Sequence, residues 1–242
     1  MCNFIFENEN ELMNFFLKSR SYYYFKNFEL ERKIKRETIG WLLISQSKYT
    51  DYKKVLNHFF NIVSDSNNLW FGFIFRPNKN LIFNNAPEKI ENFMHEILFS
   101  NHDLKTKIDL CLDKAKLKIE GVKHGLVTLL LYLSNPDEYN IWLPKMTEQA
   151  LCKLNRLEKL PDKNWGENYI KFNDAANKFK KDYSLSCREI DWIFSKIFVN
   201  VEGDGKGKFS VSSKMFEQQE VNLSSGYELY MKENNIRIEI IV

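Results

Sequence analysis

An almost uninterrupted apolar segment, residues 125–133 (GLVTLLLYL), constrains the fold of this chain more than any other feature. Its apolar residues show no period that would separate a helix from a strand. The leucine-rich middle and the stop at Ser134-Asn135-Pro136 favour a helix that is buried on most of its sides. A membrane-spanning helix needs about 20 apolar residues, so this segment is too short to cross a bilayer. We therefore expect a central core helix.

Helical patterns continue on both sides of this segment as far as residue 196. A capping box formed by Ser186 and Glu189 precedes one of the expected helices. The other segments with amphipathic or capped patterns are residues 10–19, 29–47, 51–63, 87–98, 103–112, 147–154 and 166–183. Residues 69–75 fit either a strand or a buried connector. If they form a strand, residues 81–83 complete a short hairpin around a turn at residues 77–80. The chain is therefore expected to be mainly α, a helical bundle around the buried central helix.

The pattern changes after residue 196. Apolar residues alternate in segments 198–201 and 209–211, which flank the glycine-rich residues 202–208, and they alternate again in 236–241. These patterns predict a hairpin and a last strand. The overall class is then α+β, with a small antiparallel β element at the C-terminus. We expect a helical domain over residues 1–196, subdivided near 64–86, and a β-rich element over residues 197–242.

Composition narrows the class of protein. Of 242 residues, 44% are hydrophobic and 15% aromatic, which is enough for a large core. The net charge of +3 is small, so any contact with nucleic acid must come from a local patch. The four cysteines are widely spaced, with no CxxC pair, and predict reduced thiols and no zinc site. The acidic N-terminus has no signal-peptide pattern, and we expect a cytoplasmic protein without a cofactor or a membrane contact.

Residues 119–125 (IEGVKHG) predict a tight turn between two helices. Both glycines tolerate positive φ and would leave backbone amides uncovered at a helix N-terminus, where phosphate binds readily. Lys123 would lie at this helix N-terminus, and the lysines just before the turn would enlarge the contact with phosphate. The predicted nucleic-acid-binding residues are Gly121, Val122, Lys123, His124, Gly125, Lys114, Lys116 and Lys118.

This turn resembles a helix-hairpin-helix element, the DNA-backbone clamp of many repair proteins. Ile119, Gly121-Val122 and the apolar helix that follows carry the resemblance, and Lys123 stands where the usual hairpin has its second glycine. Residues 135–142 (NPDEYNIW) resemble the segment after the hairpin in base-excision DNA glycosylases. They are also similar to helical segments of bacterial restriction and defence proteins, as are Gly166-Glu167-Asn168-Tyr169 and Asp191-Trp192. The likeness covers about residues 100–196.

An enzymatic role is left open by this resemblance. The glycosylase aspartate is not found, because residues 143–145 are Leu-Pro-Lys, and Gly125 stands where bifunctional members have a lysine. The nearest acid-base candidates are His124, Asp137 and Glu138. A nuclease would need a strand-borne acidic set around a divalent metal, and none is evident, so no metal site is predicted.

The function that we expect is nucleic-acid binding, with duplex DNA as the ligand, in a repair or a restriction and defence system. The resemblance implies backbone contact through the hairpin. One alternative is an atypical DNA glycosylase or nuclease. Another is a protein–protein interaction module that uses aromatic-rich surfaces, and partner subunits are compatible with each of these.

Overall fold

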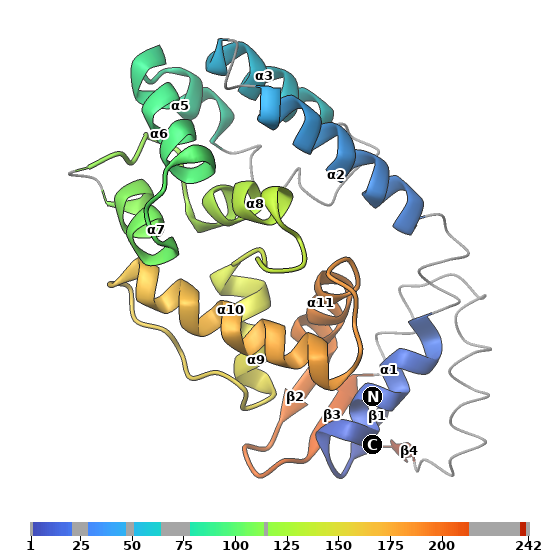
Figure 1. Ribbon diagram of the computed structural model, residues 1–242. Helices are drawn as coiled ribbons and strands as arrows, with labels where there is room; N and C mark the ends of the chain where they lie inside the picture. The colour runs from blue at the N-terminus through green and yellow to red at the C-terminus, as the bar shows by residue number, and fades with distance from the viewer. Residues whose placement is uncertain are drawn as a thin grey trace. The chain divides into compact units, whose positions relative to one another are not determined.

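The computed structural model describes residues 2–20, 29–46, 51–63, 78–113, 116–212 and 238–240 (Figure 1). The chain is mainly helical and has a small antiparallel sheet, as predicted. It divides into two compact units. One, the helical unit, comprises Lys33–Leu143 and Leu160–Lys178. The other, the sheet unit, comprises Met1–Arg32, Pro144–Lys159 and Phe179–Val242.

The helical unit holds most of the helices that the sequence predicts. Local capping fixes two of their starts: Asp51 accepts hydrogen bonds from the amides of Lys53 and Lys54, and Asp103 accepts one from the Thr106 amide. The helices are α2 (Glu29–Gln46), α3 (Tyr52–Val63), α5 (Lys79–Phe83), α6 (Pro87–Phe99), α7 (Leu104–Leu112), α8 (His124–Ser134) and α10 (Trp165–Asp182), of which α2 and α10 have their ends in the sheet unit.

The predicted central helix is α8, and its burial confirms the prediction. Every residue from Gly125 to Leu133 is buried. Helices α6 and α7 pack against it (Figure 1). Each fully buried leucine contributes about 1.5–3 kcal/mol to folding, which makes α8 the main hydrophobic element of the unit. The one phenol among these side chains is satisfied, because the Tyr132 hydroxyl donates a hydrogen bond of 2.6 Å to the Glu37 carboxylate.

The sheet unit is built around strand β1 (Cys2–Phe6). The sheet order is β2-β3-β1-β4, with every pair antiparallel; β2 is Val201–Gly203, β3 is Phe209–Ser212 and β4 is Ile238–Ile240. Phe6 lies opposite Phe209, and its ring packs 5.1 Å from that of Phe15. Phe15 belongs to α1 (Glu9–Arg20). The unit also contains a π-helical turn (Pro144–Glu148), α9 (Gln149–Lys153) and α11 (Ile190–Asn200).

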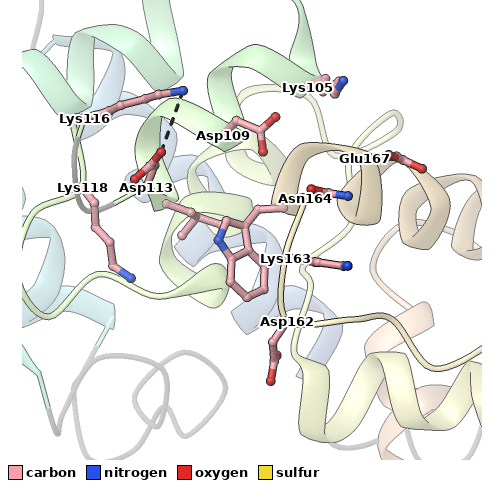
Figure 2. Close-up of a pocket in the computed structure, with 11 residues that line it drawn as sticks. Lys105, Asp109, Asp113, Lys116, Lys118, Asp162, Lys163, Asn164 and Glu167 are labelled. Atoms are coloured by element: carbon pink, nitrogen blue, oxygen red, sulfur yellow. Dashed lines mark ion pairs between the residues drawn. The ribbon is translucent and has the colours of Figure 1, made fainter.

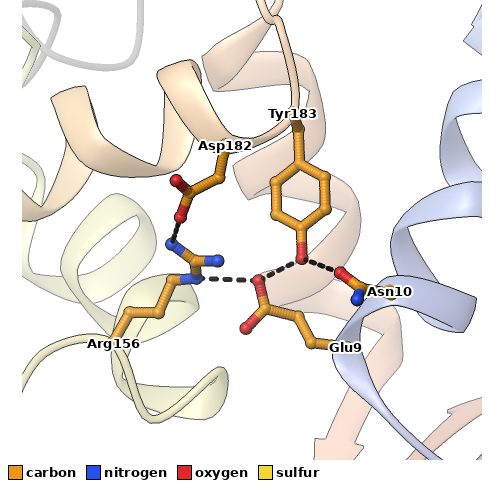
Figure 3. Close-up of polar contacts among 5 residues, drawn as sticks. All are labelled: Glu9, Asn10, Arg156, Asp182 and Tyr183. Carbon is orange, nitrogen blue, oxygen red and sulfur yellow. Dashed lines mark hydrogen bonds and ion pairs between the residues drawn. The ribbon is translucent and has the colours of Figure 1, made fainter.

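A polar cluster around Arg156 joins distant segments of the sheet unit (Figure 3). The guanidinium donates from Nε to Glu9 at 2.7 Å and from Nη1 to Asp182 at 2.6 Å. The Tyr183 hydroxyl donates to the same oxygen of Glu9 at 2.7 Å. Burial and this carboxylate raise the pKa of Tyr183 above its ordinary value, so the phenol keeps its proton. The cluster therefore joins α1 to the loop after α9 and to the C-terminal end of α10 through charge-assisted hydrogen bonds.

Several local expectations differ from the structure. Residues 81–83 lie in helix α5 and form no hairpin strand, while 69–75 lie outside the described residues. Helix α11 continues to Asn200, so the first strand of the predicted hairpin begins only at Val201. The helix expected over 147–154 is a π-helical turn followed by α9. Packing against other segments overrides local propensity at each of these positions.

The division of the chain also differs from the expected boundary at 196/197. Strand β3 pairs with β1, so the C-terminal β residues and the N-terminal segment belong to one unit. Strand β1 was not predicted, because its five residues carry no turn or period that marks a strand. Most of the proposed subdivision near 64–86 lies outside the described residues.

Candidate nucleic-acid interface

The turn at residues 119–122 forms as a tight turn, but its setting differs from a helix-hairpin-helix. Gly121 has φ 85°, and the Val122 amide donates to the Ile119 carbonyl at 3.2 Å. Helix α7 ends at Leu112, eleven residues before Lys123 caps α8, so the turn does not directly join two helices. Gly125 is a buried helical residue and does not take the expected positive φ.

The corner of this turn is packed against the start of the helical unit's α5 region. Asn85 pairs with Glu120, accepting from its amide at 2.9 Å and donating to its carbonyl at 3.1 Å. A Cβ on Gly121 would lie 2.9 Å from Ile82 and 3.0 Å from the Asn78 carbonyl oxygen. Val122 is buried. The amides of Glu120 and Val122 therefore have partners within the protein, and α5 and Asn85 cover this corner.

The lysines near the turn have different positions. Lys123 and Lys116 are exposed, and Lys118 is half-buried. Lys114 lies outside the described residues. Lys116 and Lys118 line a partly open pocket of about 770 Å³ within the helical unit (Figure 2). We call it the lysine pocket; its lining is Lys105, Asp109, Leu112, Asp113, Lys116, Lys118, Asp162, Lys163, Asn164, Trp165 and Glu167.

The lysine pocket is lined by equal numbers of lysines and carboxylates, but most of the carboxylates already have partners within the protein. The Asp109 carboxylate accepts a hydrogen bond of 2.8 Å from the Gly166 amide, at the N-terminus of α10. Asp113 lies 3.9 Å from the Lys116 ammonium. Glu167 pairs with Lys171 at 2.7 Å, which lowers the pKa of that carboxyl. Most of the pocket's carboxylates are thus engaged within the protein.

Two of the pocket's lysines are not engaged in this way. Within the part of the chain that the structure describes, the ammonium groups of Lys105 and Lys163 form no ion pair. They come from α7 and from the loop before α10, on the side of the pocket away from Lys116 and Lys118 (Figure 2). Lysines therefore line the pocket on two sides, and those on the side of Lys105 and Lys163 form no ion pair within the described residues.

An aromatic group forms one wall of the pocket. Trp165, the first residue of α10, is half-buried and lines the cavity. Its ring centroid lies 4.7 Å from that of His124, which in turn lies 4.6 Å from Trp142. Burial, followed by the charge of Lys118, lowers the pKa of His124 to about 4. The imidazole is thus neutral near pH 7 and acts as a packing ring behind Trp165.

The segment Gly166-Glu167-Asn168-Tyr169 has a structural explanation. A Cβ at Gly166 would lie 2.3 Å from the Lys105 carbonyl oxygen, so α10 approaches α7 more closely than any side chain allows. The Asn168 side chain donates to the carbonyls of Pro161 and Lys163 at 2.6 and 2.7 Å. These contacts hold the loop that carries Asp162 and Lys163 at the edge of the pocket.

Residues 135–142 are likewise held by specific polar contacts. The Glu138 carbonyl accepts hydrogen bonds of 3.0 Å from both Asn173 and Asn177, which lie one turn apart on α10. Asn140 donates to Asn173 from its amide and its side chain, at 2.9 and 2.8 Å. The Tyr169 hydroxyl donates to the Asn140 carbonyl at 3.0 Å. The motif thus fastens the chain after α8 onto α10.

The three acid-base candidates do not form one site. His124 begins α8, whereas Asp137 and Glu138 follow its end. A helix of 11 residues separates them by about 16 Å, at 1.5 Å per residue. Glu138 accepts a hydrogen bond of 2.9 Å from Asn135 and belongs to the fastened turn. Their placement provides no shared catalytic geometry.

Other site chemistry is limited in the described ranges. Among those residues, no group of three or more His, Cys, Asp or Glu side chains could hold a metal ion. Burial raises the pKa of the Cys111 thiol to about 12. In the same residues, no helix is long and apolar enough to span a membrane.

Comparisons with protein-family models, with curated proteins and with solved structures give no match for this chain.

Proposed function

We propose that this protein binds nucleic acid, with DNA as the first ligand to test, through the lysine pocket and the adjoining Lys123. The observation that carries the proposal is the convergence of Lys116 and Lys118, which precede the turn, with Lys105 and Lys163 around one cavity. Lysines that neutralise phosphates release counterions, and this release supplies most of the sequence-independent affinity for nucleic acid. A repair or a restriction and defence role would use such backbone binding.

The mode of contact differs from the hairpin clamp that the sequence suggested. Phosphate would be met by side-chain ammonium groups, because the amides at Glu120, Val122 and Gly166 already have partners inside the protein. Lys123 is exposed and follows the pocket-lining Lys118 by five positions in the sequence, so it would extend the contact. Lysine acts as a mobile point charge, so little sequence discrimination is expected from this contact.

The proposal predicts a measurable salt dependence. About three or four lysines in contact with phosphate give a slope of about −3 in a plot of log affinity against log salt concentration. Replacing both Lys118 and Lys163 by glutamate is expected to make this slope shallower by about two and to weaken binding at low salt. Lys123→Glu alone should change the slope by about one. Fluorescence anisotropy with a labelled 20-base-pair duplex and the corresponding single strand measures these effects.

A matched control separates local contact from net charge. Lys89 and Lys178 are exposed residues of the helical unit that do not line the pocket. The double variant Lys89→Glu/Lys178→Glu changes the net charge by the same amount as the pocket variant. The proposal is refuted if both double variants lose affinity equally. It is also refuted if the wild-type protein binds neither the duplex nor the single strand.

A protein-interaction role is a second candidate because α2 exposes apolar side chains. Ile34 and Leu42 are 40% and 53% exposed, and Trp41 lies beside Leu42 with 36% exposed. Aromatic and aliphatic groups of this kind are typical of interface cores. Changing Trp41 and Leu42 to serine should abolish any self-association or partner binding seen by size-exclusion chromatography with light scattering. An unchanged profile would argue against this role.

A further inference from the structure

The lysine pocket contains more than a cationic rim, because an indole forms part of its wall. Trp165 is half-buried, lines the cavity, and is supported by the His124 ring at 4.7 Å. His124 is supported in turn by Trp142, which is itself buried. Trp165 is therefore held by a rigid aromatic packing and keeps part of its surface open to the pocket.

The size of the pocket restricts what can enter it. About 770 Å³ lies within the range of about 300–1,000 Å³ that is usual for small-molecule sites. One nucleotide can be accommodated in this volume, whereas a base-paired duplex cannot enter a cavity of this size. Four lysines and one indole are among the side chains that line this cavity, so groups suited to phosphates and to a base occur together.

We infer that the lysine pocket receives one unpaired nucleotide of a nucleic-acid strand, with its base stacked on Trp165 and its phosphates contacted by Lys118 and Lys163. This inference rests on the proposed function and adds the form of the ligand, a single-stranded or locally unpaired segment. Stacking on an aromatic side chain accepts any base, because every base has a π face.

The polar lining suits an unpaired base as well. The Asn164 side chain lies in the lining beside Trp165 and offers both a donor and an acceptor to a base edge. One carboxylate oxygen of Asp109 accepts a hydrogen bond from the Gly166 amide, and the second oxygen can accept one from a base. An unpaired base can therefore form hydrogen bonds to Asn164 and Asp109 with the edge that pairing would otherwise occupy.

The experiment compares a labelled single-stranded oligonucleotide with the same strand carrying abasic residues, which keep the phosphates and remove the bases. Wild-type protein is expected to bind the ordinary strand about 5- to 150-fold more tightly, as stacking of one base predicts. Trp165→Leu should remove this ratio and leave the affinity for the abasic strand nearly unchanged. Trp165→Phe, which keeps an aromatic face, should retain most of the ratio.

Tyr139→Leu is the matched control, since Tyr139 is a half-buried aromatic residue of the helical unit that does not line the pocket. It should behave as wild type. Equal affinity of wild-type protein for ordinary and abasic strands overturns the inference, and this measurement needs no variant to fold. If that result is accompanied by lysine-dependent, salt-sensitive binding, the proposed function stands without the base site. If neither strand nor duplex binds, both fail.

Discussion

Replacement of Gly166 by alanine tests the close approach of α10 to α7, on which the geometry of the lysine pocket depends. The added Cβ would lie 2.3 Å from the Lys105 carbonyl oxygen and within 2.9 Å of its carbonyl carbon. These are backbone atoms, so a rotamer change cannot relieve the contact. The helix or its neighbour must shift by about 1 Å, and overpacking of this kind costs about 1–3 kcal/mol.

The same shift would disturb a hydrogen bond. The Gly166 amide donates to Asp109 at 2.8 Å, and a weakened bond to a buried or charged partner adds about 1–3 kcal/mol. The two costs overlap, so we expect Gly166→Ala to lower the free energy of unfolding by about 2–4 kcal/mol. For a chain of this size that corresponds to a fall of about 4–15 °C in melting temperature.

Urea unfolding followed by circular dichroism measures the change, with Gly40→Ala as the control. Gly40 lies within α2, and the nearest atoms to its added Cβ would be side-chain atoms, of the Phe59 ring at 3.1 Å and of the Leu133 methyl groups at 3.5 and 3.7 Å. Alanine also favours a helix over glycine by about 1 kcal/mol, so this variant should be within about 1 kcal/mol of wild type. If Gly166→Ala unfolds at the wild-type urea concentration, the close approach of the two helices is wrong.

Three other predictions concern the remaining polar and aromatic contacts. Arg156→Ala should destabilise the protein by about 2–3 kcal/mol in urea unfolding, since two charge-assisted hydrogen bonds are lost. Lys171→Ala breaks an exposed ion pair and should leave the urea midpoint nearly unchanged, so equal effects of the two variants would contradict this prediction. The pKa of His124 is about 4 in the folded protein and 6.5 in the unfolded chain, so the unfolded chain takes up the proton first as the pH falls. The free energy of unfolding should therefore keep its full His124 contribution above pH 6.5 and lose about 2 kcal/mol between pH 8 and pH 5. His124→Phe should lose this part of the pH dependence, and an imidazole NMR titration near pH 6.5 in the wild type would exclude the burial. Asn173→Ala should lower the free energy of unfolding by about 2–3 kcal/mol, more than Asn177→Ala, because it leaves buried donors of Asn140 unpaired. A larger fall in melting temperature for Asn177→Ala would show that the segment after α8 is held differently.

The elements that sequence reasoning predicted correctly are those whose cause is local. The helix α8 follows from its own apolar composition, and the starts of α3 and α7 follow from Asp51 and Asp103. The glycine-rich turn between β2 and β3 also formed, with positive φ at Gly205 and Gly207. Such features need only a few neighbouring residues, and these are visible in the sequence.

The features that were missed depend on contacts between distant segments. Strand β1 exists because Phe4 pairs opposite Val211, about two hundred positions later in the chain. The covering of the turn by Asn85 is another such contact, 35 positions from Glu120. Neither partner carries a local pattern that marks the pairing, so a single sequence could not predict it.

The candidate site was predictable in part. Lys116 and Lys118 were identified because they precede the turn, and both line the pocket. Lys105 and Lys163 were not, since a lysine on an exposed helix or loop is ordinary in sequence. Trp165 lies just before the helix predicted over residues 166–183, and only the contact of α10 with α7 at Gly166 brings it to the cavity. The aromatic wall therefore became visible only in three dimensions.

The most direct test of the central claim is to locate nucleic-acid contact on the protein by NMR. A ¹⁵N-labelled sample is titrated with a short single-stranded DNA. We predict that the indole N–H resonance of Trp165 and the backbone amide resonances of residues 116–118 and 162–167 move together and saturate, while those of β2 and β3 stay unchanged. Saturating shifts confined to other residues, or no shifts at all, would contradict the assignment of the lysine pocket as a nucleic-acid site.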